Sequence, residues 1–432
     1  MIKLISNNLF KGDKVVWMVF FFLCMISLVE IYSASSSLTY QQGNHWDPMM
    51  RQAGLLCAGL ILILVIARIP CKLFMLVPFV LYPISIILLV YVLFFGSSIN
   101  GGNRWIELGP LSFQPSEIAK GALIMTLAAV LSKSQTEDKV KTRKGIKTIV
   151  TASRGGHYLP FKVCMGLTIF MIMFIFTENF STAAILFTVA IAMMFIGNIP
   201  GDIMGKMMLT LVALGAIAFA ILIITPESAV SHLGGRALTW KHRIEAKLHI
   251  GSEAEAAEEK TYSIEDHWQE DNAQIAIANS NVIGLGPGNS IQRDFLSHAE
   301  SDFIYCIIVE ETGLVGGIVV ILLFIVLLIR ASRIAQKCDK FFPAFLVMGI
   351  SIILVLQALI NMGVAVGMFP VTGQPLPLIS RGGTSILITC CYFGIILSIS
   401  RYADKVSETK AEPAEAISSN ETDEYFSSEG ME

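Results

Sequence analysis

Residues 73–95 read LFMLVPFVLYPISIILLVYVLFF and contain no charged side chain. At a rise of about 1.5 Å per residue, a helix of this length can cross the hydrocarbon core of a bilayer, which is about 30 Å thick. Similar apolar runs recur along the 432 residues, of which 54% are hydrophobic and only 15% are charged. The sequence therefore predicts a membrane protein that crosses the bilayer many times.

Ten apolar runs are predicted to span the membrane, which gives an all-α fold. Their approximate bounds are Val15–Tyr32, Ala53–Ala67, Leu73–Phe95, Ile118–Leu131, Phe161–Phe176, Thr182–Ile196, Met207–Ile224, Phe303–Ile329, Phe342–Met368 and Ser385–Ile399. An even number of spans puts both ends of the chain on the same side. We therefore predict one ten-helix membrane domain over residues 1–402.

Basic residues indicate the orientation, because Lys and Arg concentrate in loops that stay in the cytoplasm. With the N-terminus inside, the inner segments hold most of the 31 Lys and Arg residues, while the short outer loops hold only Arg51, Arg104 and Arg381. We therefore expect a multi-pass protein of the cytoplasmic (inner) membrane with both termini in the cytoplasm. The net charge of −3 gives no indication of nucleic-acid binding.

Two segments are too polar to span the membrane. Residues 226–302 lie between the seventh and eighth runs and are too long to be a simple connector. Residues 403–432 are acidic and rich in Ser, Glu and Asn, a composition typical of disorder. We expect a large extracytoplasmic loop and a disordered cytoplasmic tail.

Ionisable residues inside apolar runs are costly to bury and therefore informative. Glu117 and Lys120 are three positions apart, on one face of a predicted helix, so they can pair. Two interpretations stay open: a structural ion pair at the helix entry, or a cavity wall that binds an anionic group. The preceding loop carries Arg104 and Trp105, which suit either a phosphate contact or an ordinary interfacial aromatic residue.

A second polar region precedes the eighth run. Asp302 lies where an outer vestibule would meet the bilayer, so its carboxylate can serve as a general base or cap the following helix. Residues 284–288, GLGPG, follow no βαβ unit, so we expect a tight turn against the membrane and not a dinucleotide site. The Cys and His residues show no metal-ligand spacing, and no metal site is predicted.

Four motifs follow one another in a distinctive order. They are Gly101-x-x-Arg104-Trp105 with Gln114-Pro115-Ser116-Glu117-x-x-Lys120, then Gly284 to Gln292, then Asp302-Phe303-Ile304 with Glu310-Glu311-x-Gly313, and finally Pro370 to Ser385. Together they resemble the SEDS family (shape, elongation, division and sporulation), peptidoglycan glycosyltransferases of the FtsW and RodA type. Residues 288–292 look more like the FtsW branch. Where the family usually has Ser-Tyr-Gly-Gly, this chain has Ser380-Arg381-Gly382-Gly383, which adds a cation.

The resemblance implies an enzyme that polymerises lipid II, the lipid-linked disaccharide-peptide precursor, on the outer face of the cytoplasmic membrane, for septal wall synthesis in cell division. It implies Asp302 as the general base. The candidate substrate-binding residues are then Arg104, Trp105, Glu117, Lys120, Arg243, Gln292, Ser380 and Arg381. A divalent cation, Mg²⁺ or Mn²⁺, stays open as a helper. The expected partners are a class B penicillin-binding protein transpeptidase and other division or elongation proteins.

Two other functions stay open beside the enzyme. A transporter that flips lipid II also needs inward charges and a polar cavity, although no inverted repeat with paired broken helices is visible. A non-catalytic scaffold of the division machinery needs no reactive carboxylate. Substitution of Asp302 separates the enzyme from both, because only the enzyme requires a base there.

Overall fold

The computed structural model describes residues 10–34, 46–99, 102–108, 111–142, 145–152, 158–176, 179–210, 213, 256–296, 299–369 and 371–428. Within these ranges, eight helices are long and apolar enough to cross a membrane, and Phe180–Ile196 is a shorter apolar helix. The predicted helical bundle is therefore confirmed. The seventh predicted span, Met207–Ile224, lies mostly outside the described residues, which show helix at 201–210.

The helices follow the predicted apolar runs closely. They are α2 (Lys14–Ala34), α4 (Asp47–Ile66), α6 (Val77–Phe95), α7 (Pro115–Ser134), α8 (Tyr158–Phe176), α9 (Phe180–Ile196), α14 (Ile304–Lys337), α15 (Phe341–Ala365) and α16 (Gly383–Ser428). The third run is divided, since a short helix α5 (Cys71–Phe74) precedes α6. Pro78 lies in the first turn of α6, where proline favours the start of a new helix over continuation of the previous one.

Short strands occupy two loops, a feature that the all-α prediction lacks. β1 (Ser97–Ile99), β2 (Gly102–Leu108) and β3 (Leu111–Phe113) form an antiparallel sheet between α6 and α7. β4 (Gln135–Thr142) and β5 (Gly145–Ala152) form a hairpin after α7. Both lie outside the apolar runs on which the helix assignments rest, so the membrane-spanning part stays all-α.

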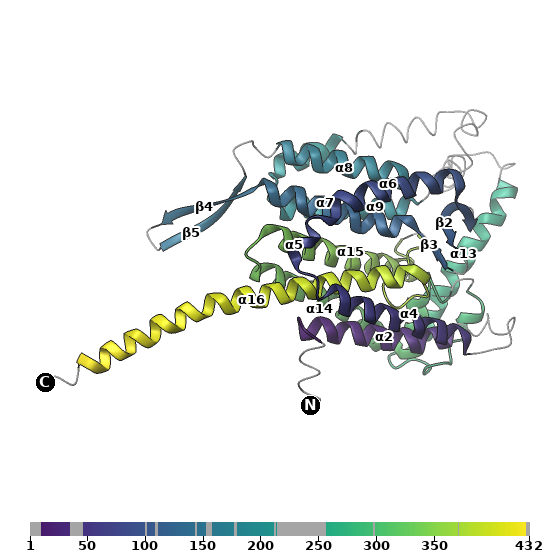
Figure 1. Ribbon diagram of the computed structural model, residues 1–432. Helices are drawn as coiled ribbons and strands as arrows, with labels where there is room; N and C mark the ends of the chain where they lie inside the picture. Colours follow the sequence, from purple (N-terminus) through teal and green to yellow (C-terminus); the bar gives the residue numbers. More distant parts are fainter. Residues whose placement is uncertain are drawn as a thin grey trace.

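The acidic tail differs from its prediction. Its composition predicts disorder, whereas α16 continues through it to Ser428 (Figure 1). The physical reason is that nucleation is the costly step of helix formation, and a spanning helix already supplies the nucleus. Ala, Glu and Lys residues in the tail favour continuation of the helix, whereas Pro413 and the Ser and Asn residues oppose it.

The interior of the bundle is formed around α7 and α15. α15 packs against α7, α9 and α14, and in Figure 1 it lies among them. The apolar window of α7 has a mean hydropathy of 1.2 and is mostly buried, whereas that of α6 has 2.5 and has few buried residues. A helix that faces protein on most sides need not be apolar all round, so α7 can carry polar residues in the interior.

The two ends of the bundle differ in what they carry. The β4–β5 hairpin and the far end of α16 project from one end, where α2 also begins (Figure 1). β2, β3 and the outer-loop helix α13 (Ala256–Asn279) lie at the other end. α16 begins at that second end, so the loop before it lies there with them.

Candidate functional site

Asp302 lies in a turn just before α14. Asp302 is half-buried, whereas the next residue, Phe303, is fully buried. Phe303 occupies the N-cap position of α14, and no side-chain hydrogen bond caps the helix there. Asp302 therefore lies one residue before the N-cap position, which the buried Phe303 occupies.

The loop between α15 and α16 holds the two residues that precede Asp302. The Ser380 hydroxyl donates to the backbone carbonyl of Ser301 over 2.6 Å. The backbone N–H of Arg381 donates to the carbonyl of Glu300 over 2.8 Å, and Arg381 Nη1 lies 3.4 Å from Glu300 Oε1. The structure thus brings Ser380 and Arg381, both predicted to bind substrate, together with the Asp302 turn.

Asn361 of α15 binds the backbone of Asp302. Its Nδ2 donates to the backbone carbonyl of Asp302 over 3.0 Å and to that of Gln374 over 2.8 Å. Gln374 Nε2 in turn lies 2.9 Å from the hydroxyl of Thr182, in the first turn of α9. Buried helices therefore fix the backbone of the proposed base. We call residues 299–302, Asn361, Ser380 and Arg381 the Asp302 site.

Glu117 and Lys120 pair inside the bundle, with 2.7 Å between Lys120 Nζ and Glu117 Oε1. Lys120 also donates to Gln357 Oε1 over 3.1 Å, and Gln357 Nε2 donates to the carbonyl of Pro375 over 3.1 Å. The Tyr392 hydroxyl donates to the backbone carbonyl of Glu117 over 3.1 Å. The pair is buried and structural in this state. It is also joined to the same α15–α16 loop that holds Asp302.

The structure shows less of the remaining predicted substrate-binding residues, Arg104, Trp105 and Arg243. Arg104 and Trp105 lie on β2, where Trp105 pairs with Ser97 of β1. β2 contacts α7, which carries Glu117 and Lys120. Arg243 lies outside the described residues.

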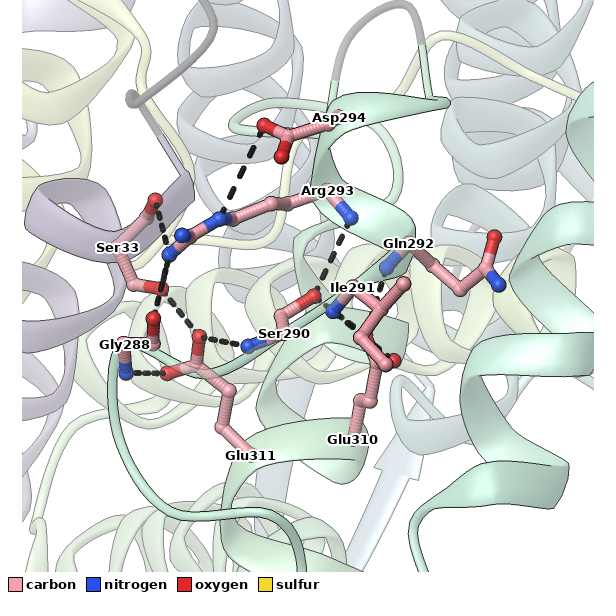
Figure 2. A network of polar contacts seen from close by, with 9 residues as sticks. All are labelled: Ser33, Gly288, Ser290, Ile291, Gln292, Arg293, Asp294, Glu310 and Glu311. Carbon is pink, nitrogen blue, oxygen red and sulfur yellow. Dashed lines mark hydrogen bonds and ion pairs between the residues drawn. The ribbon is translucent and has the colours of Figure 1, made fainter.

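Glu310 and Glu311 of α14 form a second polar centre, drawn in Figure 2. Both are fully buried. Glu311 Oε2 accepts the backbone N–H of Gly288 over 2.9 Å, and Glu311 Oε1 accepts that of Ser290 over 3.3 Å and the hydroxyl of Ser33. A buried carboxylate that accepts several N–H groups holds the loop backbone against α14 and satisfies its own acceptor oxygens.

Glu310 binds the following residues of the same loop. It accepts the hydroxyl of Ser290 and the backbone N–H groups of Ile291, over 3.2 Å, and Gln292, over 3.3 Å. Arg293 supplies positive charge nearby, and its Nη1 donates to the Gly288 carbonyl over 2.8 Å (Figure 2). We call Ser33, residues 288–293, Glu310 and Glu311 the outer-loop network.

Gly313 interrupts α14 directly after these glutamates, with φ 75° and ψ −177°. The outer loop fills the interruption. The backbone N–H groups of Leu285 and Gly286 donate to the carbonyls of Glu310 and Glu311, over 3.0 and 2.8 Å. Irregular backbone at membrane depth is tolerated when other protein groups satisfy it, as they do here.

The approach of the loop to α14 requires glycine on both sides. A Cβ on Gly313 would lie 2.2 Å from the Val282 carbonyl oxygen, and one on Gly284 would lie 2.4 Å from that of Glu311. Gly284 has φ 81°, so the tight turn that the sequence predicts at residues 284–288 is confirmed.

Sequence reasoning missed that these two motifs bind each other. Both motifs are visible in the sequence, but the pairing of one segment with another cannot be obtained from spacing within either. Gln292, predicted to bind substrate, belongs to this network through its backbone N–H. Its side chain points away from Glu310 in Figure 2.

No metal site is formed by the side chains that the structure describes. Among them, His, Cys, Asp and Glu never gather in groups of three or more with the geometry to hold a metal ion. The described residues therefore do not supply a ligand set for the divalent cation that the family resemblance left open.

Comparison with known sequences gives consistent matches over nearly the whole chain. Residues 13–405 match a family described as "Cell cycle protein", which takes its name from FtsW, RodA and SpoVE. A Haemophilus influenzae protein named "Probable peptidoglycan glycosyltransferase FtsW" is 31% identical over 397 residues, with 90% of each chain covered. A Geobacter metallireducens protein of the same name is 31% identical over 404 residues, with 92% of this chain and 97% of the relative covered.

Solved structures show the same fold. One chain, from work described as structural coordination of polymerization and crosslinking by a peptidoglycan synthase complex, aligns with a TM-score of 0.67 at 23% identity. That alignment covers 91% of this chain and 98% of the other. The rod shape determining protein RodA of Thermus thermophilus aligns with a TM-score of 0.61 at 22% identity, with 91% and 98% covered.

Proposed function

The chain belongs to the cell cycle protein family of FtsW, RodA and SpoVE, and we propose that it is a peptidoglycan glycosyltransferase that polymerises lipid II on the outer face of the cytoplasmic membrane. We assign it to septal wall synthesis in cell division, following the FtsW names of its relatives. The observation that carries the proposal is the Asp302 site. There the Ser380 hydroxyl and the Ser301 carbonyl, 79 positions apart, bind each other and fix a half-buried carboxylate residue.

Asp302 acts as the general base in this proposal. It takes the proton of the acceptor sugar's 4-hydroxyl as that oxygen attacks C1 of a MurNAc unit linked to undecaprenyl pyrophosphate. The new glycosidic bond forms, the bond from C1 to the pyrophosphate oxygen breaks, and the lipid pyrophosphate leaves with the electron pair. A positioned base contributes roughly 10²–10⁴-fold to such a step.

Cations stabilise the charge that develops on the departing pyrophosphate. Arg381 binds Glu300, two residues before Asp302, through its backbone and its side chain, and it is partly exposed. Lys120 carries three N–H groups, of which Glu117 and Gln357 use two. Its burial means that substrate must open part of the surrounding packing to reach it.

The remaining candidates contribute in less direct ways. Arg104 and Arg243 add positive charge on the outer loops, and Trp105 contacts the lipid or sugar from β2. Ser380 acts by positioning the Asp302 turn, since its hydroxyl already binds Ser301. Gln292 acts from the outer-loop network.

A divalent cation, Mg²⁺ or Mn²⁺, remains part of the proposal. The substrate's own phosphate oxygens are ligands that Mg²⁺ commonly uses, so few protein ligands are needed. When bound, the cation would neutralise the charge of the leaving group. The chain's own residues hold the base, supply Lys120 and Arg381, and orient the sugar.

We propose a class B penicillin-binding protein transpeptidase as the partner, together with other division or elongation proteins. The likeness to a chain of a peptidoglycan synthase complex supports this partner class. We also propose that both termini are cytoplasmic. The basic β4–β5 hairpin and the two described ends of the chain lie at one end of the bundle, as the distribution of Lys and Arg requires (Figure 1).

The test is polymerisation of purified lipid II by the full-length protein, alone and with its transpeptidase partner, with and without Mg²⁺ or Mn²⁺. Wild type and Asp302→Ala run side by side on a glycan-length gel. We expect polymer from the wild type only, with lipid II binding retained by the variant.

Other results would redirect the proposal. Polymer from both proteins would keep the enzyme and move the base to another carboxylate. Movement of lipid II across proteoliposomes without polymer would favour a flippase. Normal division in cells that carry Asp302→Ala, with no polymer from the purified protein, would favour a scaffold.

A further inference from the structure

The side chain of Asn361 contains a buried acceptor that no described residue uses. Asn361 is 1% exposed, and its Oδ1 has no hydrogen-bond partner among the residues that the structure describes. Native proteins seldom bury such an atom without a reason, because its lost contact with water is not replaced.

The orientation of this carboxamide follows from its partners. Its Nδ2 contacts two backbone carbonyl oxygens, those of Asp302 and Gln374. Carbonyl oxygens only accept hydrogen bonds, so the NH₂ group has to face them. The oxygen then has to face away, and exchanging the two atoms would set oxygen against oxygen.

Gln357, one turn earlier on α15, provides an internal comparison. Its Oε1 accepts from Lys120 and its Nε2 donates to the Pro375 carbonyl, so both ends of this carboxamide are used. Both side chains reach the same α15–α16 loop, yet only Asn361 keeps an open acceptor. Gln374, in the loop that Asn361 binds, also keeps an unpartnered buried Oε1. Two open acceptors therefore lie near the backbone of Asp302, where a donor from outside the chain can complete them.

We propose that Asn361 binds the acceptor sugar, with Oδ1 accepting a hydrogen bond from the 3- or 6-hydroxyl of GlcNAc. This inference rests on the proposed function. Asn361 Nδ2 donates to the backbone carbonyl of Asp302, the proposed base. Oδ1 is bonded to the same carbon as Nδ2, so it lies close to that carbonyl. The sugar donors nearest to the reacting 4-hydroxyl are the groups on the two neighbouring carbons, which carry the 3- and 6-hydroxyls.

The oxygen is covered in this structure, so sugar binding requires the packing around Asn361 to open. The Asp302 turn lies on the other side of the carboxamide, and its residues 300–302 are only half-buried. The hydrogen bond gained on arrival offsets the cost of an acceptor left unmet in the free protein. Asn361 would thus connect sugar binding to the position of Asp302.

The test compares substrates as well as variants. Full-length protein with its transpeptidase partner receives lipid II, or analogues that lack the 3-hydroxyl or the 6-hydroxyl of GlcNAc. We expect the wild type to prefer lipid II over one analogue by roughly tenfold, the size of one neutral hydrogen bond. In Asn361→Ala that preference falls to near unity, because the acceptor is gone.

The ratio between substrates is the readout, since loss of the Asn361 bond to Asp302 slows every substrate equally. Asn361→Gln keeps both an NH₂ group for the carbonyls and an acceptor oxygen and should keep the preference at a lower rate, which covers the case in which the alanine variant fails to fold. The matched control is Ser351→Ala on the same helix. Ser351 is buried and its hydroxyl binds the Val347 carbonyl of its own helix, so both rate and preference should stay unchanged.

Three results would overturn the inference. If the wild type polymerises both analogues at the same rate as lipid II, the proposed contact does not exist. An Asn361→Ala variant that keeps the wild-type preference places the contact elsewhere and leaves Oδ1 to a buried water. A wild type that makes no polymer from lipid II removes the proposed function itself, and with it the sugar contact.

Discussion

Asp302 and Glu311 lie close together in the sequence, yet they differ in burial and in which of their atoms the surrounding residues bind. At Asp302 the fold holds the backbone of three consecutive residues through Asn361, Ser380 and Arg381 and leaves the residue half-buried. At Glu311 it buries the residue completely and binds the carboxylate itself. The contacts to its backbone position the Asp302 side chain for chemistry, whereas the contacts to the Glu311 carboxylate hold the outer loop against α14.

The outer loop replaces hydrogen bonds that α14 loses at Gly313, and the Glu310 and Glu311 carboxylates satisfy the loop in return. The loop gains acceptors for its N–H groups from Glu310 and Glu311, and α14 gains donors for its carbonyls from Leu285 and Gly286. Each segment therefore satisfies the other. If this is correct, damage to the network should affect folding, and damage to the Asp302 site should affect activity alone.

The largest effect is expected for Gly313→Ala. The new methyl group would lie 2.2 Å from the Val282 carbonyl oxygen, at a φ of +75° that alanine rarely adopts. We expect no folded protein in detergent, measured as loss of the monodisperse peak in size-exclusion chromatography. Gly166→Ala on α8 is the control, because no atom lies within 4 Å of its new methyl group. A folded, active Gly313→Ala protein would show that the interruption of α14 is not required.

A second experiment separates structure from chemistry at Lys120. Lys120→Met leaves Glu117 buried without its cation, which should destabilise the protein by about 3–5 kcal/mol. The double variant Glu117→Gln with Lys120→Met should recover most of this stability, because no uncompensated charge remains. Thermal unfolding measures the first effect, and lipid II polymerisation of the stable double variant measures the second. Recovery of both stability and polymerisation would assign the pair to structure alone.

A smaller effect is expected when one network carboxylate becomes an amide. Glu311→Gln sets an NH₂ group against an N–H or hydroxyl donor, and one unmet buried donor costs about 1–3 kcal/mol. The melting temperature should fall while the remaining folded protein stays active. Asp302→Asn is the matched control and should do the reverse. If both variants lower the melting temperature by the same amount, the proposed difference between the outer-loop network and the Asp302 site is wrong.

The sequence predicts the parts of this molecule that are encoded locally. Apolar runs locate the helices, because a span must be apolar over its own length. The glycines at 284–288 likewise predict a tight turn, because glycine itself permits the positive φ angles that such a turn requires. The family resemblance names Ser380, Arg381 and Asp302 as site residues, and the structure places the first two against the turn that holds Asp302.

The contacts between distant segments could not be predicted in the same way. Both Asp302 and Glu311 are carboxylates beside an apolar run, and nothing local states which of them will be saturated by backbone N–H groups. The acidic tail shows a related limit, since its helix depends on the nucleus that α16 supplies and not on its own composition.

The smallest effect is expected at Arg381, where the two ways of holding the Asp302 turn can be separated. The backbone bond from Arg381 to Glu300 survives any side-chain substitution, so only the partly exposed pair at 3.4 Å is lost in Arg381→Gln. Such a pair contributes at most about 1 kcal/mol to stability. We expect an unchanged melting temperature and a loss of polymerisation below about tenfold, since one partly screened cation near the leaving group is removed. Arg381→Lys should restore most of the rate because it keeps the charge. If lysine and glutamine lowered the rate equally, the guanidinium would act through its bond to Glu300, and positive charge at this position would not matter for catalysis.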